Sequence, residues 1–267
     1  MHMMRRRCLL PKYKTVAFDS VGELARLYFS KDMGKHADKS GMEVIRGMQN
    51  YPGTTERLNM LVRRCKNLRD QGTEVVFLAH EQIERIYAKG GMMAKKGEAP
   101  MEPIAIKGLP EMPGKQTPEE FARAADNVVR MRKLNNDVTW VGRREPIGGG
   151  GDYWEVKTRF NSSLISGGLM PGDYNKLITA AKQNNVQLDL PYLWIIYGTF
   201  GIGKTRSLLS FPRPLKLFDL DRGSTVIKHE VETLRAAGET FDIVDNIDCE
   251  ESNHYEKFVS ELEATFG

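Results

Sequence analysis

The segment Gly198-Thr-Phe-Gly-Ile-Gly-Lys-Thr205 constrains the fold of this chain more than any other feature. It matches the pattern GxxxxGK[ST], in which glycines let the backbone curl so that its amide groups point at bound phosphates. The apolar run 192–197 precedes the motif and a segment with helical spacing follows it, so the motif lies at the strand-to-helix turn that phosphate binding requires. The sequence therefore predicts a site for a nucleotide such as ATP.

Each predicted contact in this segment has a chemical role. Lys204 would neutralise the β and γ phosphates, and Thr205 would ligate Mg²⁺ through its hydroxyl. The helix that follows would add the positive end of its dipole. The residues expected to hold the nucleotide are Gly198, Thr199, Phe200, Gly201, Ile202, Gly203, Lys204, Thr205 and Arg206.

A P-loop also needs a second carboxylate, on a neighbouring strand, to complete the Mg²⁺ shell. The best candidate is Asp19, which ends the β-branched and aromatic run 14–19. Asp219 and Asp221 are the alternatives, and one of them could instead orient the attacking water as a general base. His80, which follows another apolar run, is either a sensor of the γ-phosphate or an ordinary polar group at a strand end.

Composition limits the class of protein. The 267 residues are 40% hydrophobic and 28% charged, and no apolar run approaches the roughly 20 residues needed to cross a bilayer. We expect a soluble, cytoplasmic protein that does not bind membranes and has no export signal. The 3 cysteines are far apart in the sequence, so we expect reduced thiols and no zinc site. A net charge of +4 is too mild to indicate nucleic-acid binding by itself.

Alternating strand and helix patterns predict an α/β fold. After residue 190 the pattern is a regular β-α series, which implies a mostly parallel, twisted sheet covered by helices on both faces. Strands are expected at 14–19, 74–80, 128–131, 137–142, 154–159, 192–197, 214–219 and 241–244. Helices are expected after residue 20 and at 54–69, 117–126, 174–182, 204–210, 225–237 and 255–265.

Three further segments have weaker patterns. Strands 137–142 and 154–159 flank a glycine-rich turn at 148–151, which predicts an antiparallel hairpin extension. Residues 31–53 and 82–116 are polar and rich in glycine, with little periodicity, so both are expected to be loops. Long loops inside a compact domain are usually functional or mobile.

The order of the two site segments is unusual. In most P-loop ATPases the glycine loop comes first and the acidic strand follows, whereas here Asp19 comes first. Placing residues 190–267 before residues 10–185 restores the usual order. The rearranged chain then resembles, over nearly its whole length, the phage-encoded RecA-like ATPases associated with single-strand annealing and recombination. The segments that carry the resemblance are Ile195-Ile-Tyr-Gly-Thr-Phe-Gly-Ile-Gly-Lys-Thr205, Phe211-Pro-Arg-Pro-Leu-Lys-Leu-Phe-Asp-Leu-Asp-Arg-Gly223, Tyr13-Lys-Thr-Val-Ala-Phe-Asp-Ser20 and Val75-Val-Phe-Leu-Ala-His-Glu81.

The resemblance implies one RecA-like P-loop NTPase domain over 1–267, in circularly permuted order. Residues 10–160 would form the half with the acidic strand, the sensor and the DNA loops. Residues 161–190 would be a linker with a helix, and residues 191–267 would form the P-loop half. Circular permutation is physically admissible because chain ends commonly lie close together at a protein surface.

The resemblance also implies roles for single residues. Asp19 would be the Walker B carboxylate, and His80 would lie at the sensor position between the nucleotide and the DNA. Asp221 would lie near the activating acid of the family, where relatives of RecA often have Glu. Lys157 and Arg159 would reach the nucleotide of a neighbouring subunit, which implies a homo-oligomer or filament.

Single-stranded DNA is the partner that the resemblance implies, with DNA-stimulated hydrolysis of Mg-ATP. The loops 31–53 and 82–116 would face the DNA. The lysines expected to contact it are Lys89, Lys95, Lys96 and Lys107. Acidic residues interspersed among these lysines weaken the cationic character of the second loop.

Two other functions fit a P-loop in this chain. The first is a nucleotide-binding assembly protein that uses ATP as a structural switch, with little turnover or DNA affinity. The second is a kinase of small molecules, which is disfavoured because no arginine-rich lid segment follows the P-loop half.

Overall fold

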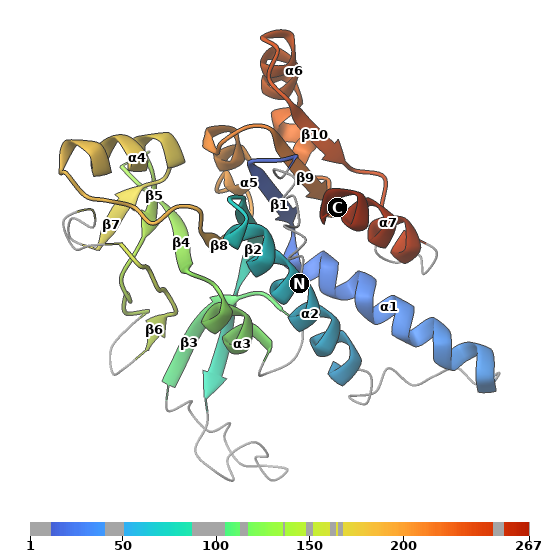
Figure 1. The fold of residues 1–267 in the computed structure, drawn as a ribbon. Helices are drawn as coiled ribbons and strands as arrows, with labels where there is room; N and C mark the ends of the chain where they lie inside the picture. Colours follow the sequence, from blue (N-terminus) through green and yellow to red (C-terminus); the bar gives the residue numbers. More distant parts are fainter. Residues whose placement is uncertain are drawn as a thin grey trace, which may run out of the picture.

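A computed structural model describes residues 12–40, 51–86, 105–112, 117–135, 137–147, 152–160, 164, 168–247 and 254–266. In these residues one large sheet lies between two layers of helices (Figure 1). The strands are β1 (Thr15–Asp19), β2 (Glu74–Ile86), β3 (Ala105–Pro110), β4 (Asn127–Leu134), β5 (Asp137–Val141), β6 (Tyr153–Trp154), β7 (Leu169–Pro171), β8 (Leu193–Gly198), β9 (Leu215–Asp219) and β10 (Phe241–Val244).

The strand order of the sheet is β10-β9-β1-β2-β8-β4-β5-β7. Neighbouring strands are parallel from β10 to β4, and β5 and β7 continue the sheet in antiparallel fashion. The far half of β2 pairs with β3 in an antiparallel hairpin, and β6 adds to β3. The parallel strands therefore end at a common edge, from which the β2–β3 hairpin projects.

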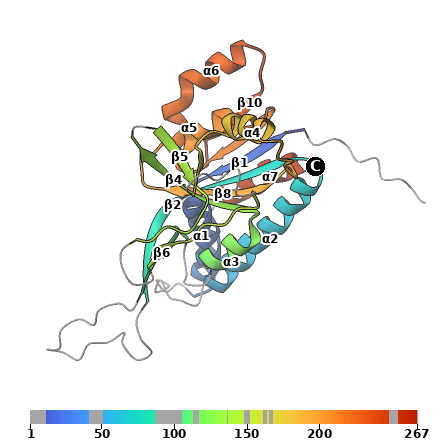
Figure 2. The same cartoon turned by 90° about the vertical axis from the view of Figure 1, so that its left-hand side faces the viewer.

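The helices are α1 (Val21–Ser40), α2 (Tyr51–Asp70), α3 (Thr117–Ala124), α4 (Tyr174–Gln183), α5 (Lys204–Ser207), α6 (Lys228–Ala236) and α7 (His254–Phe266), with 3-10 helices η3 (Leu208–Ser210) and η4 (Gly223–Ile227). Figure 2 shows α4, α5 and α6 on one side of the sheet and α1, α2, α3 and α7 on the other. No helix in the described part of the chain is long and apolar enough to cross a membrane.

The strands are apolar on both faces because helices cover both. Along β1, Val16 and Phe18 point into the core beneath α1, α2, α3 and α7, whereas Ala17 joins the core beneath α4 and α6. Phe18 stacks between Phe77 of β2 and Phe218 of β9, with ring centroids 4.9 and 5.1 Å away. This aromatic row holds three adjacent parallel strands together.

A buried carboxylate fixes the amino ends of two strands. Glu74 at the start of β2 accepts hydrogen bonds from the Tyr174 hydroxyl at 2.7 Å, the Tyr192 amide at 2.9 Å and Trp194 Nε1 at 2.8 Å. Burial raises the pKa of Glu74, and the three donors oppose that rise. Because all three donors depend on one side chain, β2, β8 and α4 are held in a single arrangement.

The expected α/β class, with a mostly parallel sheet flanked by helices, is confirmed. Both loop predictions were wrong in part. Helix α1 continues through Ser40, which lies inside the expected loop 31–53. Strands β2 and β3 extend into the expected loop 82–116. Their antiparallel pairing satisfies the backbone hydrogen bonds of this segment, although its polar sequence has no strand pattern.

The hairpin prediction was wrong in part, since the segments that flank residues 148–151 in the sequence form only one antiparallel bridge, between Pro146 and Tyr153. The expected partner strands 137–142 and 154–159 do not pair with each other, since β5 pairs with β4 and β7, and β6 spans only two residues. The β4–β5 hairpin turns instead at Asn135, which has a left-handed φ of 49°. Asparagine tolerates that conformation better than most residues, so the Asn135-Asn136 pair was the turn signal.

Candidate functional site

The predicted site residues gather where the parallel strands end. Asp19 ends β1 and pairs in register with Leu78 of β2 and Asp219 of β9, while His80 of β2 pairs with Gly198 of β8. The strand of Asp19 was expected beside the P-loop strand, and this detail was wrong because β2 lies between them. The intervening strand brings His80 into the same edge.

The loop after β8 has the backbone that its glycines allow. Gly201 and Gly203 have φ values of 72° and 98°, in the left-handed region that favours glycine. Lys204 follows directly and is only 7% exposed. Its ammonium donates to the carbonyls of Gly198 at 3.1 Å and Thr199 at 3.0 Å, so the lysine folds back over the loop.

The helix after the loop is shorter than the sequence predicts. Helix α5 ends at Ser207 and continues as the 3-10 turn η3, before Phe211-Pro212 leads out of it. Ser207 and Ser210 donate their hydroxyls to carbonyls three residues earlier, which favours the tighter turn. A helix this short adds little dipole, so the charge of Lys204 dominates the electrostatics of the loop.

Thr205 and Asp19 meet directly across the strand between them. The Thr205 hydroxyl donates to Asp19 Oδ2 at 2.5 Å, although the two residues are 186 positions apart in the sequence. Asp19 is only 3% exposed. Burial, followed by the nearby carboxylates Asp219 and Asp221, raises the pKa of Asp19 to about 6, against the lowering effect of the Thr205 bond.

The segment 220–224, which follows β9 and which we call the collar, covers the Thr205–Asp19 pair. The amides of Leu220 and Asp221 donate to the carbonyl of Asp19 at 2.5 and 3.0 Å. Asp219 accepts from the amides of Gly223 at 2.8 Å and Ser224 at 3.0 Å, which folds the segment after β9 over the site. Because its oxygens are occupied in this way, Asp219 acts as a turn-forming carboxylate and Asp221 remains the acid that faces the loop.

His80 lies between the P-loop lysine and Asp221. Its Nε2 is 3.1 Å from Asp221 Oδ2, and its Nδ1 is 3.4 Å from Lys204 Nζ. The ring of Phe200 stacks on the His80 ring with centroids 5.9 Å apart, although the Phe200 side chain is 87% exposed. Burial lowers the pKa of Lys204, and the carboxylates of Asp19 and Asp221 oppose that shift.

Other predicted residues lie away from this cluster. Arg206 points toward α6 and pairs with Glu230 at 2.6 Å. Lys157 donates to the carbonyls of Ala125 at 2.7 Å and Arg123 at 3.1 Å, at the carboxyl end of α3. These carbonyls lie at the opposite end of β8 from Gly198, and six residues of strand correspond to roughly 17 Å.

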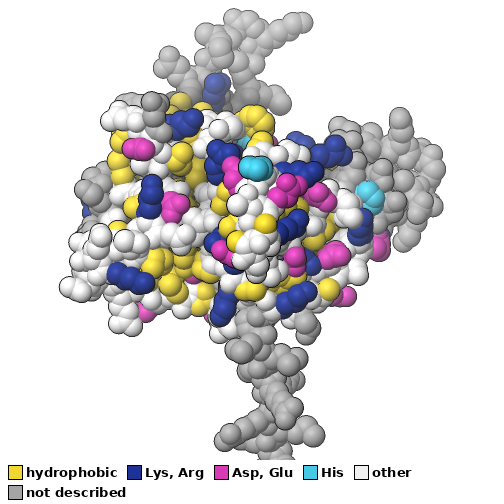
Figure 3. Space-filling view, turned by 90° about the horizontal axis from the view of Figure 1, so that it is seen from above, with side chains coloured by type: hydrophobic (Ala, Val, Ile, Leu, Met, Phe, Trp, Pro, Cys, Tyr) yellow, Lys and Arg dark blue, Asp and Glu magenta, His cyan; other side chains and the backbone are white. Residues whose placement is uncertain are grey.

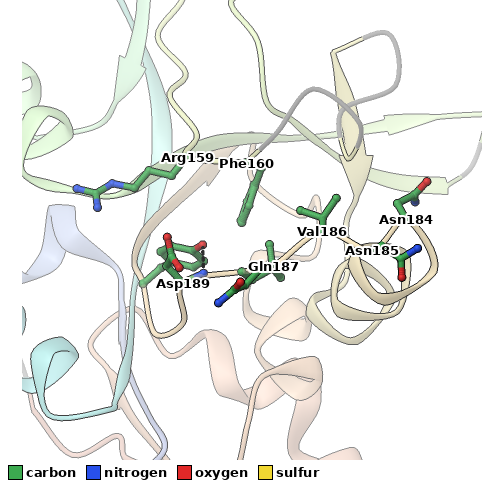
Figure 4. Close-up of a pocket in the computed structure, with 9 residues that line it drawn as sticks. Arg159, Phe160, Asn184, Asn185, Val186, Gln187 and Asp189 are labelled. Carbon is green, nitrogen blue, oxygen red and sulfur yellow. Dashed lines mark hydrogen bonds between the residues drawn. The ribbon is translucent and has the colours of Figure 1, made fainter.

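Arg159 lies at the same distant end. It pairs with the buried Asp126 at 2.8 Å, and its side chain is 60% exposed. Figure 4 shows it at one side of a cavity of about 370 Å³, whose other labelled lining residues come from Phe160 and the segment 184–189. Within one chain, Lys157 and Arg159 therefore do not reach the glycine loop.

The predicted DNA contacts are only partly described. Lys89, Lys95 and Lys96 lie outside the described residues. Lys107 lies on β3 and not on a loop, is 8% exposed, and forms an ion pair with Glu119. On the face shown in Figure 3, the Lys and Arg side chains of the described residues are interspersed with Asp and Glu, so these residues form no extended cationic patch there.

The donor set suits Mg²⁺ better than a transition metal. In the described part of the chain, no group of three or more His, Cys, Asp or Glu is arranged to hold a metal ion. Mg²⁺ bound with a nucleotide needs few protein ligands, because phosphates and waters complete its octahedron. The Thr205 hydroxyl and the Asp19 carboxylate fit that requirement.

Comparison with known proteins found no matching family model, no matching curated protein and no matching solved structure. The geometry of the site therefore carries the functional argument.

Sequence reasoning missed the part that Gly223 plays. A Cβ atom at this position would lie 2.7 Å from Asp19 Oδ2 and 2.8 Å from Thr205 Oγ1, so only glycine lets the collar approach the pair. The residue ends the quoted segment Asp219-Leu-Asp-Arg-Gly223, and an acidic pair followed by glycine after a strand was the available signal.

We predict that Gly223→Ala destabilises the protein by about 1–3 kcal/mol, because the added methyl overpacks the Thr205–Asp19 pair. Urea unfolding measures the change. Gly22→Ala is the matched control, since its Cβ would meet nothing closer than 3.8 Å. Equal stability of Gly223→Ala and the wild type would show that the collar does not press on the pair.

We also predict that Asp19→Asn, measured in EDTA, increases the free energy of unfolding by an amount that depends on pH. Folding raises the pKa of Asp19 from 3.8 to about 6, so its contribution to stability is present below pH 4 and is lost as the pH rises through 6. Asparagine cannot ionise, so above pH 6 the free energy of unfolding of the variant should exceed that of the wild type by up to about 3 kcal/mol. The two should converge near pH 4. Glu232→Gln, at an exposed site, is the control, and a gap that is independent of pH would contradict the burial argument.

Proposed function

We propose that this protein is a RecA-like P-loop ATPase, with its two halves in circularly permuted order, that hydrolyses Mg-ATP and acts on single-stranded DNA in recombination or strand annealing. The observation that carries the ATPase proposal is the 2.5 Å contact between Thr205 of the P-loop and Asp19. It unites the two predicted Mg²⁺ ligands from distant parts of the sequence at one edge of a parallel sheet.

The permutation is supported by how the two halves fit together. The P-loop half contributes β8, β9 and β10, and the other half inserts β1 and β2 between β8 and β9. Tyr13, just before β1, donates to Asp242 of β10 at 2.6 Å, so the start of one half packs on the end of the other. Joining these regions and opening the chain before β8 would preserve every strand neighbour.

The proposed chemistry uses charges that the chain already directs to this edge. Lys204 would exchange its bonds to the loop carbonyls for bonds to the β and γ phosphates. Thr205 and Asp19 would hold Mg²⁺, which neutralises charge on the phosphate oxygens when it is bound. The collar at Gly223 would keep these two ligands in place.

Asp221 is the acid best placed to orient the attacking water. It is partly exposed at the mouth of the site and is held 3.1 Å from His80. His80 also lies beside Lys204, so a change at the phosphates would be transmitted to Asp221 through one side chain. In this proposal His80 is the sensor and Asp221 is the general base.

Assembly would complete the site from a neighbouring subunit. Lys157 and Arg159 lie at the amino ends of the strands, and the P-loop lies at the carboxyl ends. A head-to-tail arrangement of subunits would bring these two ends together, which is how heterologous contacts generate filaments. A cation supplied in this way would stabilise the transferring phosphoryl group.

A nucleotide-switched assembly protein is the second candidate. The ion pair of Lys107 with Glu119 favours it, because the pair removes one of the cations expected to contact DNA. The DNA part of the first proposal rests on the resemblance of the rearranged sequence, and the ATP part rests on the site.

We predict that Lys204→Ala and Asp19→Asn each lower ATP turnover by about 100-fold or more, because each removes a charge that balances the phosphates. Steady-state turnover with and without single-stranded DNA measures this, with the exposed Lys176→Ala on α4 as control. Turnover retained in both site variants would refute the site. Wild-type turnover that DNA does not stimulate, together with no DNA retention at low salt, would favour the assembly protein.

A further inference from the structure

A second polar cavity lies away from the P-loop, beneath the β2–β3 hairpin. It has a volume of about 430 Å³ and lies between α3, β3, β6 and the segment 155–157. Figure 1 shows α3, β3 and β6 together at the lower side of the sheet. Its described lining residues include four cations and two carboxylates, so the walls have an excess of positive charge.

The cations come from four separate segments, which makes their convergence a property of the fold. Lys107 lies on β3, Arg123 on α3, Arg144 after β5 and Lys157 after β6. No single helix or strand places them by periodicity. The tertiary structure therefore places these like charges close together although they repel one another.

The two carboxylates balance only part of this charge. Glu119 pairs with Lys107 and lies 3.4 Å from Arg123, whose side chain is 78% exposed. The hydrogen bond from Lys107 lowers the pKa of Glu119, which keeps this carboxylate ionised. The ammonium of Lys157 donates to neutral backbone carbonyls. An anionic ligand would balance the remaining charge.

One of the cations lies over an aromatic ring and is exposed. The guanidinium of Arg144 lies 4.4 Å from the ring centroid of Tyr153 and 3.3 Å from both carboxylate oxygens of Glu155. Its side chain remains 60% exposed. A guanidinium plane fixed in this way can stack on a nucleobase, and the neighbouring cations can contact the phosphates that flank that base.

We propose that this cavity binds single-stranded nucleic acid, with Arg144 stacking on a base and Arg123 contacting an adjoining phosphate. A nucleic-acid strand fits this cavity better than a free phosphate does, because its cations extend from the buried Lys107 to the exposed Arg123. The planar guanidinium of Arg144 lies among them. The inference rests on the DNA part of the proposed function and adds Arg123 and Arg144 to the predicted DNA contacts.

The test is binding of a fluorescein-labelled 30-nucleotide oligo(dT) to the full chain, followed by anisotropy at several salt concentrations. Arg123→Ala/Arg144→Ala should bind about 10-fold or more weakly. Its slope of log affinity against log salt should be smaller by about 0.7, the value for the one phosphate contact that Arg123 makes. Arg26→Ala/Lys176→Ala is the matched control, since it removes two exposed cations from other helices.

A third variant separates stacking from charge. Arg144→Lys keeps the charge and loses the planar group, so affinity should fall while the salt slope stays at the wild-type value. Thermal melting of each variant checks that it is folded. Wild-type affinity and salt slope in Arg144→Lys would overturn the stacking role.

Three results would overturn the proposal. The first is equal affinity of the double variant and its matched control. The second is displacement of the oligonucleotide by inorganic phosphate beyond the effect of chloride at matched ionic strength, which would assign the cavity to a small phosphate ligand. The third is no wild-type binding at low salt. The first two results leave the DNA part of the proposed function intact, whereas the third removes that part as well. None of the three alters ATP turnover or its loss in Lys204→Ala, so failures of the cavity, of the DNA part and of the ATPase part are distinguishable.

Discussion

The parallel register of β1, β2, β8 and β9 is the constraint on which the site depends. Because these strands run in one direction, Asp19, His80, the glycine loop and the Asp221 segment all lie at the edge where their parallel pairing ends, although β2 itself continues to Ile86. The row of stacked rings through Phe18 fixes that register from within the core. A shift of one strand by one residue would turn its edge residue to the opposite face and separate the pair formed by Thr205 and Asp19.

Burial gives this edge its electrostatic character. It raises the pKa of Asp19 and lowers that of Lys204, so each group is pushed toward its neutral form. In the proposed function, a cation beside Asp19 and phosphates beside Lys204 favour the charged form of each. The contacts that would bind Mg²⁺ and phosphate would then also keep Asp19 and Lys204 in their charged forms. Asp219 has a different role, because its oxygens accept from the amides of the collar.

The sequence predicted the parts of this protein that have strong local patterns. The glycine loop after β8, the position of Asp19 at the end of β1 and the α/β class follow from glycine spacing and alternating apolar runs, and β10 has the expected bounds. Non-local pairing was harder to predict. The β2–β3 hairpin and the position of β2 between β1 and β8 depend on partners far along the chain. Polar residues such as Lys107 also interrupt the apolar pattern by which β3 could have been predicted. The pattern Asp219-Leu-Asp-Arg-Gly223 marks the glycine, but its close approach to Asp19 and Thr205 depends on tertiary contacts.

The central claim is that Thr205 and Asp19 form one Mg²⁺ site for a bound nucleotide. ATP binding measured by calorimetry in Mg²⁺ and in EDTA tests it, for the wild type, Thr205→Val, Asp19→Asn and the double variant. The account predicts that Mg²⁺ tightens binding by the wild type, that each single variant loses this gain, and that the double variant loses no more than either. A gain that persists in both single variants, or losses that add as they would for independent sites, would contradict it.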